Sequence, residues 1–292
     1  MKINNLTLIL LFLVFTNFSY KIIYDPALVT ITKSTYNNET FHSINMNRKG
    51  QRIKVKYFNG TNQGKTVYQR YAEWSKGKNI ILFSSAGYVS SLDNNITEGL
   101  TIDEGRLVNR SIEKNKFDAL VIIYPPQGGG GIVVSNLTDG NLNATCKSVY
   151  TTFDLRKKSD DFEDFIDCAK DESFTVFQTH LLVFKSELKL FNNSSKKIQE
   201  RRFLAVGIDQ SGNIIHSIIQ NPNQTTLKDG AEKVFNFLKE MKGFKNITFM
   251  INLDTGSQDV FQLFDKNGSV RSDIKGDVKP EEAVNLLVYY YE

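Results

Sequence analysis

Short apolar runs and alternating polar and apolar positions occur along most of the chain. Gln51–Phe58 alternates charged and apolar residues, which is the pattern of a half-buried strand. Four other runs have the length and apolar content of buried strands: Asn79–Phe83, Phe117–Tyr124, Phe174–Phe184 and Ile247–Leu253. The pattern therefore predicts a protein rich in strands.

Turn residues join several of these strands into hairpins. Gln210–Asn213 contains a glycine and separates two apolar runs, Phe203–Asp209 and Ile214–Gln220, as a hairpin turn does. The turn at Asn59–Gly64 leads to Lys65–Trp74, which we expect to return as the second strand of a hairpin. Further turn signals predict hairpins within Ile102–Val108 and after Phe261–Phe264.

Helical periodicity is clear in two places. Leu227–Lys242 has one apolar face and is preceded by Thr226, a good N-cap residue. Asp160–Cys168 has apolar residues at helical spacing and predicts a shorter helix. The last part of the chain leaves two readings open, because the segment after Pro280 fits a helix while Val288–Tyr291 fits a final strand.

These elements predict an α+β fold: a single strand-rich domain with a mixed sheet and two or three packed helices. No internal repeat or low-complexity linker interrupts it. We expect a signal peptide at residues 1–19, strands and a connection at residues 20–79, and the main domain at residues 80–292.

The first residues have the composition of a signal peptide. Lys2 supplies a positive charge, Leu6–Phe18 an apolar core, and Ser19 a small residue for cleavage, although a retained anchor is an alternative. No later segment is long and apolar enough to span a membrane. The remaining chain carries eleven N-glycosylation sequons, more than chance placement gives, which favours a secreted glycoprotein over an asparagine-rich genome: Asn38, Asn59, Asn95, Asn109, Asn136, Asn143, Asn192, Asn193, Asn223, Asn246 and Asn267.

Composition excludes several other classes. The 292 residues are 40% hydrophobic and 23% charged, as in soluble globular proteins, and the net charge of +4 is too small and dispersed for a nucleic-acid-binding protein. Cys146 and Cys168 are expected to form one disulfide in an oxidising compartment, with two buried thiols as the alternative. Cysteine and histidine spacing predicts no metal site, and no cofactor is expected. The glycines Gly128–Gly131 lack the Lys-Ser/Thr pair of a phosphate-binding loop and predict a hairpin loop.

Asp254 is the first candidate for catalysis. It follows the buried run Ile247–Leu253 and begins a glycine-containing turn, and loops at strand ends often carry functional groups. A turn-capping role is the alternative. We interpret Asp209 as a hairpin cap and Asp259 as a surface or structural residue.

Arg201 and Arg202 lie at the start of a predicted strand. Because side chains alternate along a strand, only one of them can point into a site. A guanidinium matches the paired oxygens of a phosphate, and we expect Arg202 to be the better phosphate ligand.

Five ordered motifs carry a resemblance to the phosphodiester glycosidase domain family, over about residues 80–290. They are Ser85-Ala86-Gly87-Tyr88, where the family typically has Asn-Gly-Gly-Phe; Gly99 to Asn109; Gln178 to Val183; Arg201 to Gly212; and Asn252-Leu253-Asp254-Thr255-Gly256, where the family has Asn-Leu-Asp-Gly-Gly. Ser85, Ala86 and Thr255 depart from the family pattern, which puts activity in doubt because they fall in the expected active site.

The resemblance implies a secreted glycoside hydrolase that cleaves a sugar-1-phosphodiester, of the N-acetylglucosamine-1-phosphodiester type. Asp254 would then be catalytic, and the residues expected to bind the carbohydrate or sugar-phosphate substrate are Arg202, Arg201, Gln178, Thr179, Ser85, Gly87 and Gly256. His180 is interpreted as structural. The alternative is a catalytically degenerate, glycan-binding glycoprotein on the same fold. The sequence does not indicate an oligomeric state.

Overall fold

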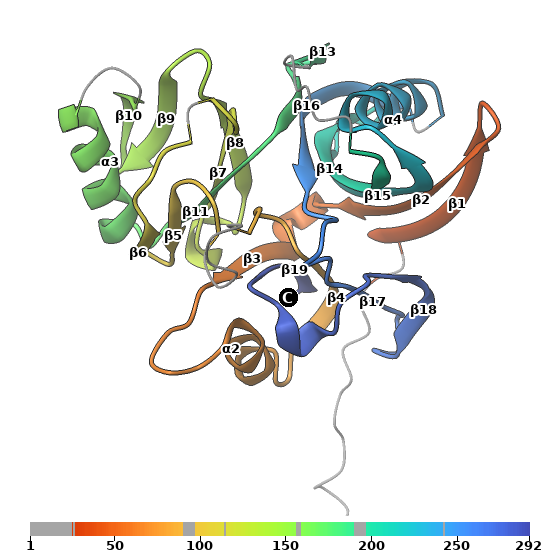
Figure 1. Ribbon diagram of the computed structural model, residues 1–292, viewed down its shortest axis with the longest axis horizontal. Helices are drawn as coiled ribbons and strands as arrows, with labels where there is room; N and C mark the ends of the chain where they lie inside the picture. The colour runs from red at the N-terminus through yellow and green to blue at the C-terminus, as the bar shows by residue number, and fades with distance from the viewer. Residues whose placement is uncertain are drawn as a thin grey trace, which may run out of the picture.

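Three antiparallel sheets make up most of the protein (Figure 1). The computed structural model describes residues 25–292 apart from 26, 90–96, 114, 156–158, 190–196 and 242. The expected signal peptide and the sequons at Asn95, Asn192 and Asn193 lie outside the described residues.

The largest sheet has seven strands, in the order β1 (Val29–Tyr36), β2 (Glu39–Asn47), β15 (Ile214–Thr225), β14 (Gln199–Asp209), β16 (Phe244–Leu253), β12 (Leu181–Phe184) and β13 (Glu187–Leu188). A five-stranded sheet has the order β6 (Arg106–Asn109), β5 (Thr101–Asp103), β11 (Thr175–Thr179), β7 (Ala119–Ile123) and β8 (Ile132–Asn136). A second five-stranded sheet has the order β18 (Val270–Lys275), β17 (Phe261–Phe264), β4 (Asn79–Ser84), β19 (Asn285–Tyr291) and β3 (Ile53–Asn59). A two-stranded hairpin, β9 (Asn141–Cys146) and β10 (Val149–Asp154), forms a separate small sheet.

Every pair of described strands is antiparallel, so the expected mixed sheet is wrong. Parallel pairs need long crossover connections, whereas hairpins here join many successive strands directly. The fold is a single strand-rich domain, consistent with α+β but mostly β. Two strands that precede residue 80 pair with later strands, β2 with β15 and β3 with β19.

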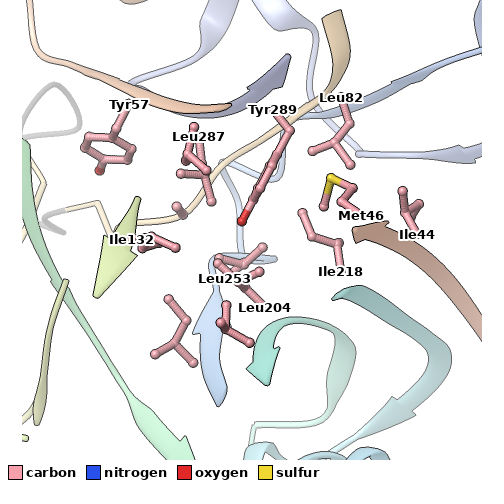
Figure 2. Close-up of a cluster of buried hydrophobic side chains, with 14 of the residues drawn as sticks. Ile44, Met46, Tyr57, Leu82, Ile132, Leu204, Ile218, Leu253, Leu287 and Tyr289 are labelled. Carbon is pink, nitrogen blue, oxygen red and sulfur yellow. The ribbon is translucent and has the colours of Figure 1, made fainter. Parts of the chain in front are cut away.

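One hydrophobic core is shared by all three sheets. Tyr289 of β19, Leu204 of β14 and Ile132 of β8 belong to the same buried cluster, and Figure 2 shows side chains from the three sheets converging on its centre. Each large apolar side chain that is fully buried contributes about 1.5–3 kcal/mol to stability. The sheets therefore hold one another in place, and the ends of their strands are fixed relative to each other.

Each sheet has its outer face covered by a helix. The helix α4 (Leu227–Met241) packs on the seven-stranded sheet, where Phe237 stacks on Phe41 with ring centroids 4.6 Å apart. The helix α3 (Ser159–Asp171) and the β9–β10 hairpin cover the first five-stranded sheet, and α2 (Val67–Trp74) covers the second (Figure 1). Three short 3-10 turns complete the elements: Lys49–Gln51, Pro126–Gly128 and Pro280–Glu282.

The helices α3 and α4 confirm the periodicity, and Asp229 N donates to the N-cap Thr226 Oγ1 at 3.1 Å. The disulfide is also confirmed, since Cys146 of β9 is bonded to Cys168 of α3 with their Cα atoms 5.6 Å apart. Gly128–Gly131 lies in the turn of the β7–β8 hairpin, as expected.

Two local expectations are wrong, and one that the sequence leaves open is resolved. Lys65–Trp74 is not a strand but contains α2, because Thr66 and Gln69 form a capping box that starts a helix. Phe174–Phe184 is not one strand: it is divided at His180, where the chain passes from one sheet to another. After Pro280 the chain makes only a 3-10 turn before β19, so the final strand is the correct reading.

The described sequons differ in how exposed their asparagines are. Asn59 and Asn136 are buried, and Asn59 Nδ2 donates inside the protein to Thr97 Oγ1 at 3.0 Å, so neither presents its amide to solvent. Asn109 is partly buried, and the others are exposed: Asn38, Asn143, Asn223, Asn246 and Asn267. No helix within the described part of the chain is long and apolar enough to cross a membrane.

Candidate functional site

Asp254 begins the turn that follows β16, and only 6% of it is exposed. Its Oδ1 accepts a hydrogen bond from Gly256 N at 2.9 Å, and its own N donates to Ala86 O at 3.3 Å, at the end of β4. The second carboxylate oxygen, Oδ2, makes no hydrogen bond with any described residue. A Cβ at Gly256 would lie 3.1 Å from Asp254 Oδ1, so the glycine allows the turn to fold this closely.

Burial raises the pKa of Asp254 from 3.8 to about 6. The charge of Asp259 raises the pKa further, while the Gly256 N–H and the charges of Lys197 and Arg202 lower it. A buried carboxyl without an ion-pair partner is unusual, and such groups concentrate at functional sites.

Thr255 secures this turn to the start of β14. Its Oγ1 donates to Glu200 O at 2.8 Å and accepts from Gln199 Nε2 at 3.1 Å. Thr255 is not among the non-glycine residues with positive φ, so the turn needs no glycine at this position. The departure from the family pattern therefore adds a tether without straining the backbone.

Arg202 is completely buried and paired. Its Nη1 and Nη2 donate to Asp259 Oδ1 and Oδ2 at 2.5 and 3.3 Å, and its guanidinium lies 4.2 Å from the ring centre of Phe261. Nη2 also donates to Gln220 Oε1 at 3.3 Å. The structure therefore commits Arg202 to holding the loop that carries Asp254, and its guanidinium presents no surface to a substrate.

Arg201 points to the other side of β14 and has no carboxylate partner. Its side chain is held by carbonyl oxygens, with Nε donating to Thr225 O at 3.3 Å and Nη2 to Lys197 O at 2.6 Å. No described carboxylate lies within 4 Å of it. Burial lowers the pKa of Arg201, and the nearby Asp254 opposes this effect. Among the described residues, the site thus contains a buried cation and a buried carboxyl group that have no ion-pair partner and that interact electrostatically.

Tyr88 and His180 extend the site beyond Arg201. Tyr88 is half-buried, its Oη accepts from Asn252 Nδ2 at 2.6 Å, and its ring stacks on Phe117 at 4.9 Å. Burial raises the pKa of Tyr88, with Asp254 adding to the effect, so the phenol stays protonated and keeps its proton to donate. The rings of His180 and Tyr88 meet edge to face at 5.2 Å.

His180 is neutral at physiological pH. Burial lowers the pKa of His180 to about 4, and the positive charges of Lys116 and Arg201 lower it further. Its ring makes no hydrogen bond with a described residue. Asn252 Oδ1 is also buried without a hydrogen-bond partner in the described part of the protein. Two polar groups beside Tyr88 are therefore left without a hydrogen-bond partner among the described residues.

The remaining expected residues make hydrogen bonds within the protein. Ser85 is 2% exposed, and its Oγ donates to Gln258 O at 2.7 Å and accepts from Val260 N at 2.9 Å. Gln178 accepts from Leu100 N at 2.7 Å and donates to Phe117 O at 3.3 Å. These two side chains are used within the fold.

Thr179 and Gly87 also serve the fold. Thr179 Oγ1 donates to Asn252 O at 2.7 Å. Gly87 is clamped by Asn285, whose Oδ1 accepts from Gly87 N at 3.1 Å and whose Nδ2 donates to Gly87 O at 2.9 Å. A Cβ at Gly87 would lie 2.7 Å from Tyr57 Oη.

Of the sequence candidates, the structure brings together Asp254, Gly256 and Arg201, with the Gly87 loop beside them. The site residues expected from the sequence do not include Tyr88, His180 or Asn252, although Tyr88 and Asn252 belong to two of the motifs that carry the resemblance. No three described His, Cys, Asp or Glu side chains form a group that could hold a metal ion.

Comparison with known proteins gives a fold relationship. No protein-family model matches the chain, and no curated protein matches its sequence. Among solved structures, the chain is similar to the zebrafish N-acetylglucosamine-1-phosphodiester alpha-N-acetylglucosaminidase catalytic domain, auto-inhibited by its pro-peptide, with a TM-score of 0.50, 17% identity, and coverage of 90% of this chain and 82% of that chain. A hypothetical protein from Synechocystis matches with a TM-score of 0.48 and 12% identity, covering 90% of this chain and 62% of that chain. At these identities the likeness establishes a related fold and nothing finer.

Proposed function

We propose that this protein is a secreted hydrolase that cleaves sugar-1-phosphodiesters, of the N-acetylglucosamine-1-phosphodiester type, at a site centred on Asp254. One observation carries the proposal: among the described residues the buried carboxyl of Asp254 has no ion-pair partner, and it interacts electrostatically with the guanidinium of Arg201, which is held by carbonyl oxygens alone. Such an arrangement suits a substrate that brings its own negative charge to the cation and an electron-poor carbon to the carboxylate. The zebrafish enzyme of related fold is named for cleavage of such a bond.

The chemistry needs little acid catalysis, because a phosphodiester oxygen is already a good leaving group. Arg201 binds the phosphate oxygens with charge-assisted hydrogen bonds. The bond between the anomeric carbon and the phosphate oxygen breaks, the electron pair leaves with the phosphate, and water adds to the carbon. Ionised Asp254 stabilises the positive charge that develops on the sugar ring or accepts the proton of the water. Tyr88 Oη and neutral His180 are placed to donate hydrogen bonds to the substrate.

The test is an assay of purified full-length protein for release of free sugar from a panel of sugar-1-phosphodiesters. We expect turnover by the wild type, loss of at least about a hundredfold in kcat/KM in Asp254→Asn and Arg201→Met, and no loss in Asp209→Asn, which alters a carboxyl in a hairpin turn far from the site. Because the ionised carboxylate acts, kcat/KM should rise with pH through about 6. Turnover by Asp254→Asn at the wild-type rate would exclude the proposed site.

The second candidate function is binding of sugar phosphates without turnover. Ser85 favours this candidate, because it stands where the resembled family usually has asparagine. Its hydroxyl is already hydrogen-bonded to Gln258 O and Val260 N. Calorimetry with a sugar-1-phosphate separates the two candidates. Binding that depends on Arg201, without release of sugar from any phosphodiester, would establish the binding protein.

A further inference from the structure

A cavity of about 430 Å³ opens between β8 and the seven-stranded sheet, away from Asp254. It is lined by Val206 of β14 and Phe249 of β16, each five residues along its strand from the candidate site. At about 3.3 Å per residue this places the cavity about 16 Å from Asp254 and Arg201. Its volume falls within the roughly 300–1,000 Å³ of small-molecule sites.

The walls of this cavity are apolar. Ile132 and Val134 of β8, which are 6% and 9% exposed, face Val206 and Phe249, which are 6% and 2% exposed. All four belong to the core shared by the three sheets, so the cavity is an open end of that core. An apolar chain entering here would extend the core, at about 0.8 kcal/mol per buried methylene.

One charged side chain, Arg48, lines the cavity. Its Nη1 donates to Gly130 O at 2.9 Å and its Nη2 to Gly129 O at 2.8 Å, so it holds the glycine loop between β7 and β8. No described carboxylate lies within 4 Å of it. Burial lowers the pKa of Arg48, as expected for a cation that is partly desolvated and not neutralised by an acid.

Two other polar side chains lie beside Arg48 at the same cavity. One ring nitrogen of His216, Nδ1, is hydrogen-bonded to Tyr289 Oη at 2.9 Å, and the other makes no hydrogen bond with a described residue. Gln51 approaches the glycine loop, and a Cβ at Gly129 would lie 3.0 Å from Gln51 Oε1. The cavity thus combines an apolar interior with a cation and hydrogen-bonding groups at one end.

We propose that this cavity is a second binding site, separate from the Asp254 site, for an amphiphile with a carboxylate head and an unbranched apolar chain. The carboxylate lies against Arg48, with His216 and Gln51 beside it, and the chain lies along Ile132, Val134, Val206 and Phe249. Charge complementarity selects the head group, because an anion supplies the counter-charge that the described residues do not give Arg48. In this proposal the glycine loop between β7 and β8, which has no part in the Asp254 site, positions Arg48 at the cavity.

The test is calorimetry of the full-length protein with decanoate and, in parallel, with decylammonium of the same chain length. We expect decanoate to bind and decylammonium to bind at least about tenfold more weakly, since one charge-assisted hydrogen bond is worth that much. Equal binding of the two amphiphiles, or no decanoate binding, would overturn the proposal, and this comparison needs no mutant.

Variants then locate the site. Arg48→Met should weaken decanoate binding at least about tenfold, while Arg52→Met, an exposed arginine four residues further on, should leave it unchanged. Arg201→Met should also leave it unchanged, which separates this site from the proposed hydrolase site. Decanoate binding to Arg48→Met with wild-type affinity, in a variant with wild-type circular dichroism, would refute the assignment.

Discussion

Replacing Asp254 by asparagine should stabilise the folded protein at neutral pH while removing the carboxylate proposed for catalysis. Burial raises the pKa of Asp254 from 3.8 to about 6. Each pH unit of such a difference is worth about 1.4 kcal/mol, so keeping the buried carboxyl ionised costs the fold about 3 kcal/mol. Asparagine is neutral and retains an oxygen that can accept the Gly256 N–H.

The direction in which stability changes with pH follows from proton binding. The folded state binds the proton of Asp254 more tightly than the unfolded state, so the wild type loses stability as the pH rises from about 4 to about 6. Below that window both states are protonated and the penalty disappears. The advantage of Asp254→Asn should therefore be small at about pH 4 and reach about 1–3 kcal/mol above about pH 7.

Urea unfolding of the wild type and Asp254→Asn at the two pH values measures this difference. Asp209→Asn is the matched control with the opposite sign, because hydrogen bonds, chiefly from the Asn213 side chain, lower the pKa of Asp209 and its ionised form stabilises the fold. That variant should be less stable than the wild type at neutral pH. The reasoning is refuted if Asp254→Asn gains nothing at neutral pH, or gains the same amount at both pH values.

Two further predictions concern the framework of the site. Gly87→Ala should cost about 1–3 kcal/mol of unfolding free energy and lower kcat/KM, because the added Cβ would lie 2.7 Å from Tyr57 Oη. The control in urea unfolding is Gly131→Ala. Its Cβ would meet nothing within 4 Å, so this variant should leave stability unchanged. Reduction of the Cys146–Cys168 disulfide should lower stability by about 3 kcal/mol, seen as an earlier unfolding midpoint in the presence of a reductant, and an unchanged midpoint would show that the loop is already ordered without the bond.

The sequence predicts elements whose pattern is local. The helix α4 and the β14–β15 hairpin follow directly from apolar periodicity and turn residues. The sequence wrongly predicts a strand for the helix α2, because a helix of this length shows little periodicity. The capping-box pair Thr66 and Gln69 is the signal in the sequence that identifies the helix. The break at His180 leaves no clear pattern in the sequence, because β11 and β12 follow one another with a single residue between them and only the tertiary structure assigns them to different sheets.

The sequence predicts which strand ends carry the site, but it does not predict which side chains pair there. Alternation along β14 requires Arg201 and Arg202 to point in opposite directions, yet only the fold reveals that Arg202 meets Asp259. Which acid pairs with which arginine depends on a loop 57 residues further along the chain, and a single sequence carries no signal for such a contact. The same holds for Ser85, whose hydroxyl is consumed by the loop before β17.

The pairing of β3 with β19 has a consequence for synthesis. Among the described strands β3 is an edge strand that pairs only with β19, and β19 lies between β3 and the central strand β4. On the ribosome, β3 therefore emerges early and waits, with Ile53, Val55 and Tyr57 uncovered, until residues 285–291 have been made. Such long-range pairing is slow and leaves apolar edges open to aggregation. Nascent chains and truncated fragments that lack β19 are accordingly expected to depend on chaperones, whatever the stability of the finished protein.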